Sequence, residues 1–451
     1  TSEDHEWASK SRQGVGEYMS RYFFYADPAI PREYEKTVPQ VFPTTAPGNF
    51  TYLPEMGHYV MTTFYPYQWD LNYSNPRVFN EMMYNFLYLA NQGMDIIRID
   101  AVPYIWKQLG TNCRNLPQVH TIVRMMRMIG EIVCPGIVLL GEVVMEPKEV
   151  APYFGTVEKP ECHMLYNVTT MATTWHTVAT RDIRLLRRQM DVVCSLPREY
   201  TFLNYLRCHD DIGWGLDYAS LREWGMEEVS HKKYLNDYFQ GKTEGSVSRG
   251  ELYNEDPVTG DARFCATTAS MCGVESAGFE QDQEKMACAI RKDLMLHAYM
   301  FTQSGIPMLY SGDEIGQVND YTYREDPDKA PDSRYIHRGK FCWDLTERIK
   351  DGSSVQGRIF GGLEKLEQIR RTEAVFGADA EVYTKDYNDN SILWIVRRAG
   401  DEELHAVFNF SDEGRTIWMP EKAQYTNLVT GVTQETETVE LSGWDFVWMK
   451  R

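Results

Sequence analysis

Three carboxylates that follow predicted buried strands are the residues best suited to chemistry in this sequence. Asp100 and Glu142 each end a short apolar run rich in aliphatic residues, and Asp210 ends a third run. Parallel strands separated by helices bring their carboxyl ends to one edge, so we expect the three acids to face one another. Two carboxylates placed in this way are typical of glycosidic-bond chemistry.

The neighbours of each acid suggest its role. Arg98 lies two residues before Asp100, so both side chains point the same way, and the guanidinium favours the ionised carboxylate that a nucleophile requires. An apolar setting beside another carboxylate raises the pKa of Glu142 and suits a proton donor. His209 and Asp210 would hydrogen-bond sugar hydroxyls through a neutral imidazole and a carboxylate.

Each acid taken alone has a structural alternative. Asp100 can form an ion pair that closes a barrel layer, Glu142 can bond to a loop, and Asp210 can cap a helix. Three strand-end acids together are harder to explain by coincidence. No metal-ligand spacing, phosphate-binding loop or GxSxG elbow competes for the site, so we expect no metal and no cofactor.

Two predicted helices position the first two strands. Asn75 and Pro76 predict a helix start and Gly93 its end, with apolar residues at helical spacing between them. A second helix presents an apolar face over 119–129 and ends before Pro135. This alternation predicts the fold class α/β, a (β/α)8 TIM barrel with loop-rich insertions and a C-terminal antiparallel β domain.

The rhythm of the pattern divides the chain into five predicted parts. They are a loop-rich excursion over 1–74, barrel strands with helices over 75–213, a second excursion over 214–275, the end of the barrel over 276–375, and a C-terminal β-sandwich over 376–451. About five core strands are visible where a closed barrel needs eight. We therefore expect the first strands to be absent from this sequence.

Composition limits the classes of partner. A formal charge of −19 argues against nucleic acid. No run approaches the ~18 apolar residues that a membrane span needs. The 9 cysteines are odd in number and lack a CxxC pair, which favours reduced thiols and a cytoplasmic location, with secretion left open.

Three motifs resemble those of glycoside hydrolase family 13, the α-amylase family, and most of all its amylosucrase and sucrose-hydrolase branch. They are Gly93–Val102, Gly141–Glu142 and Asn204–Trp214, and the likeness extends to Gln68–Asn72, Ala101–Thr111, Asn115–Gln118 and Pro331–Arg338. The resemblance implies that Asp100 is the nucleophile, Glu142 the general acid/base and Asp210 the stabiliser of the transition state.

The resemblance also implies binding residues. Arg98, His209 and Arg334 would hold the glucosyl ring. The fructosyl or acceptor site would be lined by Phe64, Gln68, Asp211 and Arg263.

Two further features bear on completeness and on the reaction. The segment Thr1–Trp7 resembles the one directly after the third barrel strand of the family, which implies that strands one to three belong to a missing N-terminal segment. Pro39 stands where some polymerising members carry an arginine, which favours hydrolysis or short transfer over polymer synthesis.

The function we expect is that of a retaining, amylosucrase-like enzyme that cleaves sucrose and transfers glucose to an α-glucan or to water. One alternative is an α-amylase or α-glucosidase that acts on maltooligosaccharides. An alternative from another class is an inactive relative that binds carbohydrate.

Overall fold

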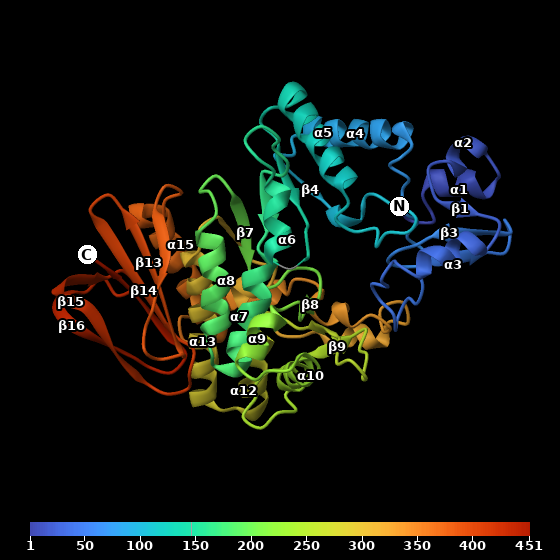
Figure 1. Ribbon diagram of the computed structural model, residues 1–451. Helices are drawn as coiled ribbons and strands as arrows, with labels where there is room; N and C mark the ends of the chain where they lie inside the picture. Colours follow the sequence, from blue (N-terminus) through green and yellow to red (C-terminus); the bar gives the residue numbers. More distant parts are fainter. Residues whose placement is uncertain (146) are drawn as a thin grey trace. The chain divides into compact units, whose positions relative to one another are not determined.

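The computed structural model describes residues 1–145 and 147–451, which divide into two compact units (Figure 1). Unit 1 comprises Thr1–Val144 and Lys148–Tyr166. Unit 2 comprises Asn167–Arg451 together with Met145–Pro147. Among the described residues, no helix combines the length and the apolarity that crossing a bilayer demands.

The first part of unit 1 is built from short elements around an aromatic core. The elements are α1 (Glu6–Arg12), α2 (Gly16–Met19), β1 (Phe24–Tyr25), α3 (Ala29–Glu35), β2 (Phe50–Leu53) and β3 (His58–Met61). The strands form an antiparallel sheet in the order β1-β3-β2. Trp7, Tyr22 and Trp69 fill its core. We expected a loop-rich excursion here and did not foresee these strands, because strands of two to four residues are too short to show alternation.

The rest of unit 1 alternates helix and strand as predicted. The elements are α4 (Pro76–Asn91), β4 (Ile96–Ile99), η1 (Val102–Tyr104), α5 (Pro117–Val133), β5 (Val138–Gly141), α6 (Pro147–Val150, of which Pro147 is assigned to unit 2), η2 (Ala151–Phe154) and β6 (Met164–Tyr166). Strands β4, β5 and β6 are parallel neighbours. The carboxamide of Asn75 accepts from the N–H of Arg77 at 3.1 Å and starts α4. Phe86, Ile122 and Leu139 pack α4 and α5 onto this sheet.

Unit 2 contains two parallel strands flanked by long helices. The strands are β7 (Thr201–Tyr205) and β11 (Ile306–Met308). The helices are α7 (Val168–Thr180), α8 (Arg184–Cys194), α13 (Gln283–Thr302) and α15 (Val355–Thr372). Sequence reasoning missed α7, because it is buried almost all round and shows no amphipathic period. Its threonines bond back to helix carbonyls, as Thr174 does to Thr170 at 2.6 Å.

The second predicted excursion also contains regular structure. Its elements are β8 (Ile212–Gly213), α9 (Tyr218–Glu223), α10 (Glu228–Phe239), β9 (Glu251–Tyr253), β10 (Arg263–Cys265), α11 (Thr268–Cys272) and α12 (Val274–Glu280). The strands pair antiparallel in the order β8-β10-β9. Short turns of helix follow β11, namely η3 (Asp313–Ile315), η4 (Tyr321–Glu325), η5 (Ser333–His337), α14 (Trp343–Thr346), η6 (Glu347–Lys350) and, after α15, η7 (Ala374–Phe376).

The chain ends in a six-stranded antiparallel sheet, drawn in orange and red in Figure 1. Its strands are β12 (Glu381–Lys385), β13 (Ile392–Ala399), β14 (Glu402–Asn409), β15 (Arg415–Asn427), β16 (Thr433–Leu441) and β17 (Asp445–Lys450). Their spatial order is β12-β13-β14-β17-β15-β16. Trp394, Val407 and Tyr425 belong to its core. The predicted C-terminal antiparallel domain is thus confirmed.

A pair of buried histidines in unit 2 makes stability sensitive to acid. His176 on α7 and His231 on α10 lie with ring centroids 5.0 Å apart, and neither ring nitrogen of His176 has a hydrogen-bond partner among the described residues. Burial lowers the pKa of His176 to about 3 and that of His231 to about 4. The unfolded chain therefore takes up protons first as the pH falls below about 6.5, and the fold loses stability.

We predict that His231→Gln makes unfolding less dependent on pH. Between pH 7 and pH 4 the wild type should lose about 3 kcal/mol of unfolding free energy through this histidine, since its pKa lies about 2.5 units below the ordinary value. Denaturant unfolding at several pH values measures the effect, with Lys233→Gln on the same helix as the control. An identical pH dependence in His231→Gln and wild type would contradict the prediction.

Candidate active site

Arg98 holds Asp100 and Glu142 together in unit 1. Its Nη1 lies 2.6 Å from Asp100 Oδ1 and its Nη2 lies 2.8 Å from Glu142 Oε1. The register of the parallel strands explains this, because Arg98 pairs with Leu140 and Ile99 pairs with Gly141. The strands β4 and β5 therefore end level, and both acids leave the sheet at the same end.

The backbone around the two acids is specialised. A Cβ on Gly141 would lie 2.6 Å from Cys162 Sγ and 2.9 Å from a methyl group of Leu165 on β6, so a side chain directly before Glu142 would force these two side chains to move. Ala101 has φ 46°, a left-handed conformation that costs a non-glycine residue roughly 1–2 kcal/mol. Its N–H donates to Glu142 Oε2 at 2.9 Å. Strain of this kind, next to two acids, is typical of a functional site.

The two carboxylates have different surroundings. The side chain of Asp100 is 76% exposed and that of Glu142 is 17% exposed. Burial raises the pKa of Glu142 to about 7, although the charge of Arg98 and the N–H of Ala101 oppose this rise. The raised pKa lets Glu142 keep its proton closer to neutral pH, as a proton donor requires, while Asp100 is open to a reactant.

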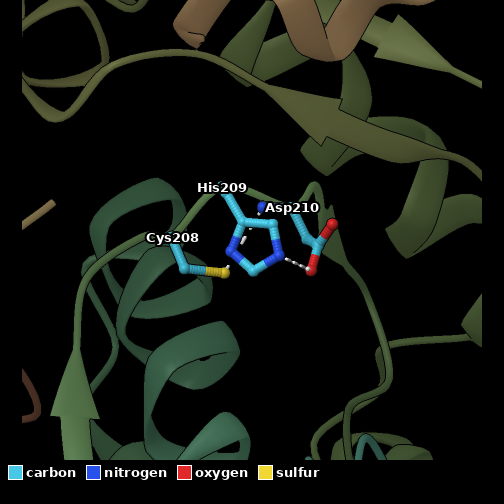
Figure 2. Close-up of side chains that lie close together, drawn as sticks. All are labelled: Cys208, His209 and Asp210. Carbon is cyan, nitrogen blue, oxygen red and sulfur yellow. Dashed lines mark hydrogen bonds and ion pairs between the residues drawn. The ribbon is translucent and has the colours of Figure 1, made fainter. Parts of the chain in front are cut away.

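The third acid, Asp210, lies in unit 2 in a cluster of charged groups (Figure 2). Its Oδ2 lies 3.0 Å from His209 Nε2, and its Oδ1 lies 3.3 Å from Arg338 Nη2. Arg338 Nε also donates to the carbonyl of His209 at 2.5 Å. This arrangement fixes the backbone that carries both residues.

The protonation of His209 differs from our expectation. Its hydrogen bond to Asp210, with a smaller contribution from Cys208, raises the pKa of His209 to about 10. The imidazole is therefore a cation at neutral pH, where the sequence suggested a neutral ring. The reason is local, since a carboxylate on the next residue folds back onto the ring.

Cys208, His209 and Asp210 place a sulfur, a nitrogen and an oxygen within 4.8 Å of one another. Figure 2 shows the imidazole between the thiol and the carboxylate, with one ring nitrogen facing each. The thiol also accepts the N–H of Asp210 at 3.4 Å. The imidazole thus has a neighbour at each of its two ring nitrogens.

Further arginines surround the neighbouring Asp211 in unit 2. Arg263 Nε lies 3.9 Å from Asp211 Oδ1, and β10 carries Arg263 opposite Gly213 of β8. Arg334 binds Asp332 through Nε and Nη2, the latter at 2.7 Å. Burial raises the pKa of Asp211, and the charges of Arg263 and Arg334 oppose that rise.

The structure groups the predicted site residues within each unit. In unit 1 it brings together Arg98, Asp100 and Glu142, and in unit 2 it brings together His209, Asp210, Asp211, Arg263 and Arg334. Phe64 packs edge-on against Tyr104 with ring centroids 5.1 Å apart. Gln68 is exposed and forms a backbone bridge with Ser2, so its described contacts do not reach the acids.

Sequence reasoning missed two residues of these groups. Arg338 binds Asp210, and its signal was a second arginine four residues after Arg334 in the same motif. Tyr166 ends β6, and the guanidinium of Arg98 lies 5.6 Å from its ring centroid. A lone tyrosine at the end of a short strand carries no signal of its own.

Comparison with known proteins shows which family and which solved structures this chain is similar to. The family described as "Alpha amylase, catalytic domain" matches residues 1–211, the part of the chain that holds Asp100, Glu142 and Asp210. The structure is similar to that of sucrose 6F-phosphate phosphorylase from Thermoanaerobacter thermosaccharolyticum, with a TM-score of 0.69 and 18% identity over 97% of this chain and 80% of that one. The α-amylase-family fold, with its parallel strands and C-terminal antiparallel domain, is thus confirmed.

The curated relatives of this chain include phosphorylases and trehalose synthases. Glucosylglycerate phosphorylase of Spirochaeta thermophila is 27% identical over 86% of this chain and 66% of its own length, and that of Escherichia coli K12 is 25% identical over 92% and 70%. Trehalose synthase of Thermus thermophilus is 26% identical over 70% of this chain and 28% of its own. The chain spans about two thirds of the length of the phosphorylases it matches. These relatives are phosphorylases and synthases, not amylosucrases.

We predict a basic limb near pH 7 in the pH profile of kcat/KM on an α-glucoside, because Glu142 must be protonated to donate. Arg98→Met should move this limb to higher pH, since the arginine favours the ionised glutamate. The control is Arg77→Met, which removes a surface ion pair with Glu17. A limb at the same pH in Arg98→Met and wild type would contradict this assignment.

Proposed function

We propose that this protein is a retaining enzyme acting on α-glucosides, with Asp100 as nucleophile, Glu142 as general acid/base and Asp210 as stabiliser of the transition state. The observation that carries the proposal is the pair of carboxylates bound to one guanidinium. Retaining enzymes need their two carboxyl groups ~5–5.5 Å apart, and a shared arginine holds two carboxylates at short range. Their different exposure supports one attacking and one protonating group.

The proposed reaction proceeds in two displacements. The carboxylate of Asp100 attacks the anomeric carbon, the bond to the leaving-group oxygen breaks, and Glu142 gives that oxygen its proton. Glu142, now ionised, takes a proton from the acceptor hydroxyl, whose oxygen displaces Asp100 from the sugar. Two inversions return the α-configuration.

The charged cluster of unit 2 supports the role of Asp210. A transition state with oxocarbenium character gains from a nearby carboxylate. The contacts with His209 and Arg338 hold the carboxylate of Asp210 in one orientation. We further propose that His209 and Arg334 donate to hydroxyls of the glucosyl ring, and that Phe64, Gln68, Asp211 and Arg263 serve the leaving group and acceptor.

We propose sucrose as the glucosyl donor, because the sequence motifs resemble those of the amylosucrase branch. Pro39, in place of the arginine of polymerising members, favours transfer to water or a small acceptor. An α-glucosidase acting on maltooligosaccharides would release sugar from maltotriose faster than fructose from sucrose, and assays of both substrates separate the two.

Asp100→Asn should lower sucrose cleavage by at least about 10³-fold, because removal of the nucleophile leaves only the binding contributions. Fructose release measures it. Asp95→Asn, an exposed aspartate just before β4, is the matched control and should keep its activity. If Asp100→Asn folds like the wild type and keeps a tenth of its activity, the proposed nucleophile is wrong.

Phosphorolysis is a second candidate, favoured by the arginines around Asp211. Three guanidinium groups, of Arg263, Arg334 and Arg338, influence this one buried carboxyl group. Arginine is suited to phosphate and carboxylate because its planar fork donates two parallel hydrogen bonds. The relatives named glucosylglycerate phosphorylase support an acceptor or leaving group that carries negative charge.

With phosphate present, the second candidate predicts that glucose 1-phosphate forms from sucrose or from glucosylglycerate. Arg263→Gln should then lower the ratio of glucose 1-phosphate to free glucose at least tenfold, since water needs no cation. Arg324→Gln, which removes an ion pair with Glu251, is the control. Equal ratios in Arg263→Gln and wild type would exclude this arginine from phosphate binding. Release of glucose alone by the wild type, with phosphate present, would exclude phosphorolysis.

A further inference from the structure

A cavity of about 740 Å³ lies in unit 2, apart from the groups proposed for catalysis. Its lining includes the end of α8, the residues leading into β7 and β11, and parts of β12 and β13. Thr201 begins β7 at this cavity, whereas Asp210 follows the other end of that strand. The volume falls in the range of ~300–1,000 Å³ typical of small-molecule sites.

Two arginines bring positive charge to the cavity wall. Arg397 on β13 is buried, and it donates to the carbonyls of Val375 at 2.6 Å and Thr302 at 2.9 Å. Arg370 on α15 donates to the carbonyl of Gly305 at 2.7 Å, and also to that of Phe301. Both guanidinium groups thus cap the carboxyl end of α13, where a cation is favoured.

Among the described residues, these caps bring no carboxylate into contact with either guanidinium group. A helix end supplies only about half a negative charge. Within the part of the chain that the structure describes, no carboxylate lies at ion-pair distance from Arg370 or Arg397. Burial and the charge of Arg370 lower the pKa of Arg397 to about 10. A buried charge without a counter-ion is costly, so an anion in the cavity would offset that cost.

The remaining lining suits a ligand that has both charge and hydroxyl groups. Arg370 donates to these carbonyls through its Nη1 and Nη2 atoms, and Arg198, a third arginine of the lining, is exposed. Asp191, Glu381 and Tyr383 also line the cavity. Carboxylates accept from sugar hydroxyls, and an aromatic ring offers a face to a sugar ring.

We propose that this cavity binds a small phosphate ester of a sugar or polyol, with the phosphate at Arg370 and Arg198 and the hydroxyl groups at Asp191 and Glu381. The site lies at the start of β7 and β11 and against the C-terminal sheet, so its ligand would bind both parts of unit 2. This proposal does not depend on the reaction proposed above, because it involves none of the same residues.

Thermal unfolding of the full chain tests the site, with glucose 6-phosphate and inorganic phosphate compared with chloride at equal ionic strength. We expect glucose 6-phosphate to raise Tm saturably by at least about 2 °C, since a ligand that binds only the folded state stabilises it. Glucose and inorganic phosphate should each give a smaller rise at the same concentration. Rises with glucose 6-phosphate no larger than with chloride would overturn the proposal.

Variants show whether a rise in Tm comes from glucose 6-phosphate bound in the cavity. Arg370→Gln and Arg198→Gln should each raise the half-saturating concentration of glucose 6-phosphate at least tenfold. If Arg370→Gln fails to fold, Arg198→Gln still tests the site, because it removes no buried contact. Arg291→Gln is the matched control, because Arg291 also donates to a carbonyl, that of Gly443, but does not line the cavity. An effect lost in Arg338→Gln and kept in the cavity variants would place the phosphate at the catalytic residues and refute this inference.

Discussion

The guanidinium of Arg98, shared by Asp100 and Glu142, is the interaction on which the proposed chemistry of this protein depends. One cation between two carboxylates offsets the mutual repulsion that would otherwise drive them apart or favour uptake of a proton between them. Because Glu142 is largely shielded from solvent and Asp100 is exposed, the same arginine serves an acid with a raised pKa and a carboxylate open to a substrate. Loss of this cation would alter both groups at once.

The fold around this interaction keeps the two acids level. Strands β4 and β5 pair in a register that ends them together, and the packing of α4 and α5 holds that register. Gly141 lets β6 approach closely. The left-handed turn at Ala101 then aims an N–H at the carboxylate of Glu142. These features restrict the substitutions that are possible before and after the acids.

The sequence predicted much of this arrangement, for physical reasons that differ from element to element. Helix α4 could be predicted because Asn75 and Pro76 start it and its apolar residues recur at helical spacing. Asp100 and Glu142 could be predicted because each follows an apolar strand. Helix α7 was not, since burial on nearly all sides removes the period. The charge of His209 was also hidden, because it depends on how the side chain of Asp210 folds back, which no pattern encodes. Arg338 reaches Asp210 from 128 residues away, a contact that only the folded chain shows.

The assignment of Asp100 as the nucleophile is tested most directly by trapping the covalent intermediate. A 5-fluoro-α-glucosyl fluoride forms the glucosyl-enzyme quickly and releases it slowly, so the labelled residue can be located by peptide mass spectrometry. The arrangement around Arg98 predicts one glucosyl label per chain, on Asp100, and none in Asp100→Asn. A label on another residue, or turnover of the reagent without any covalent adduct, would contradict the central claim.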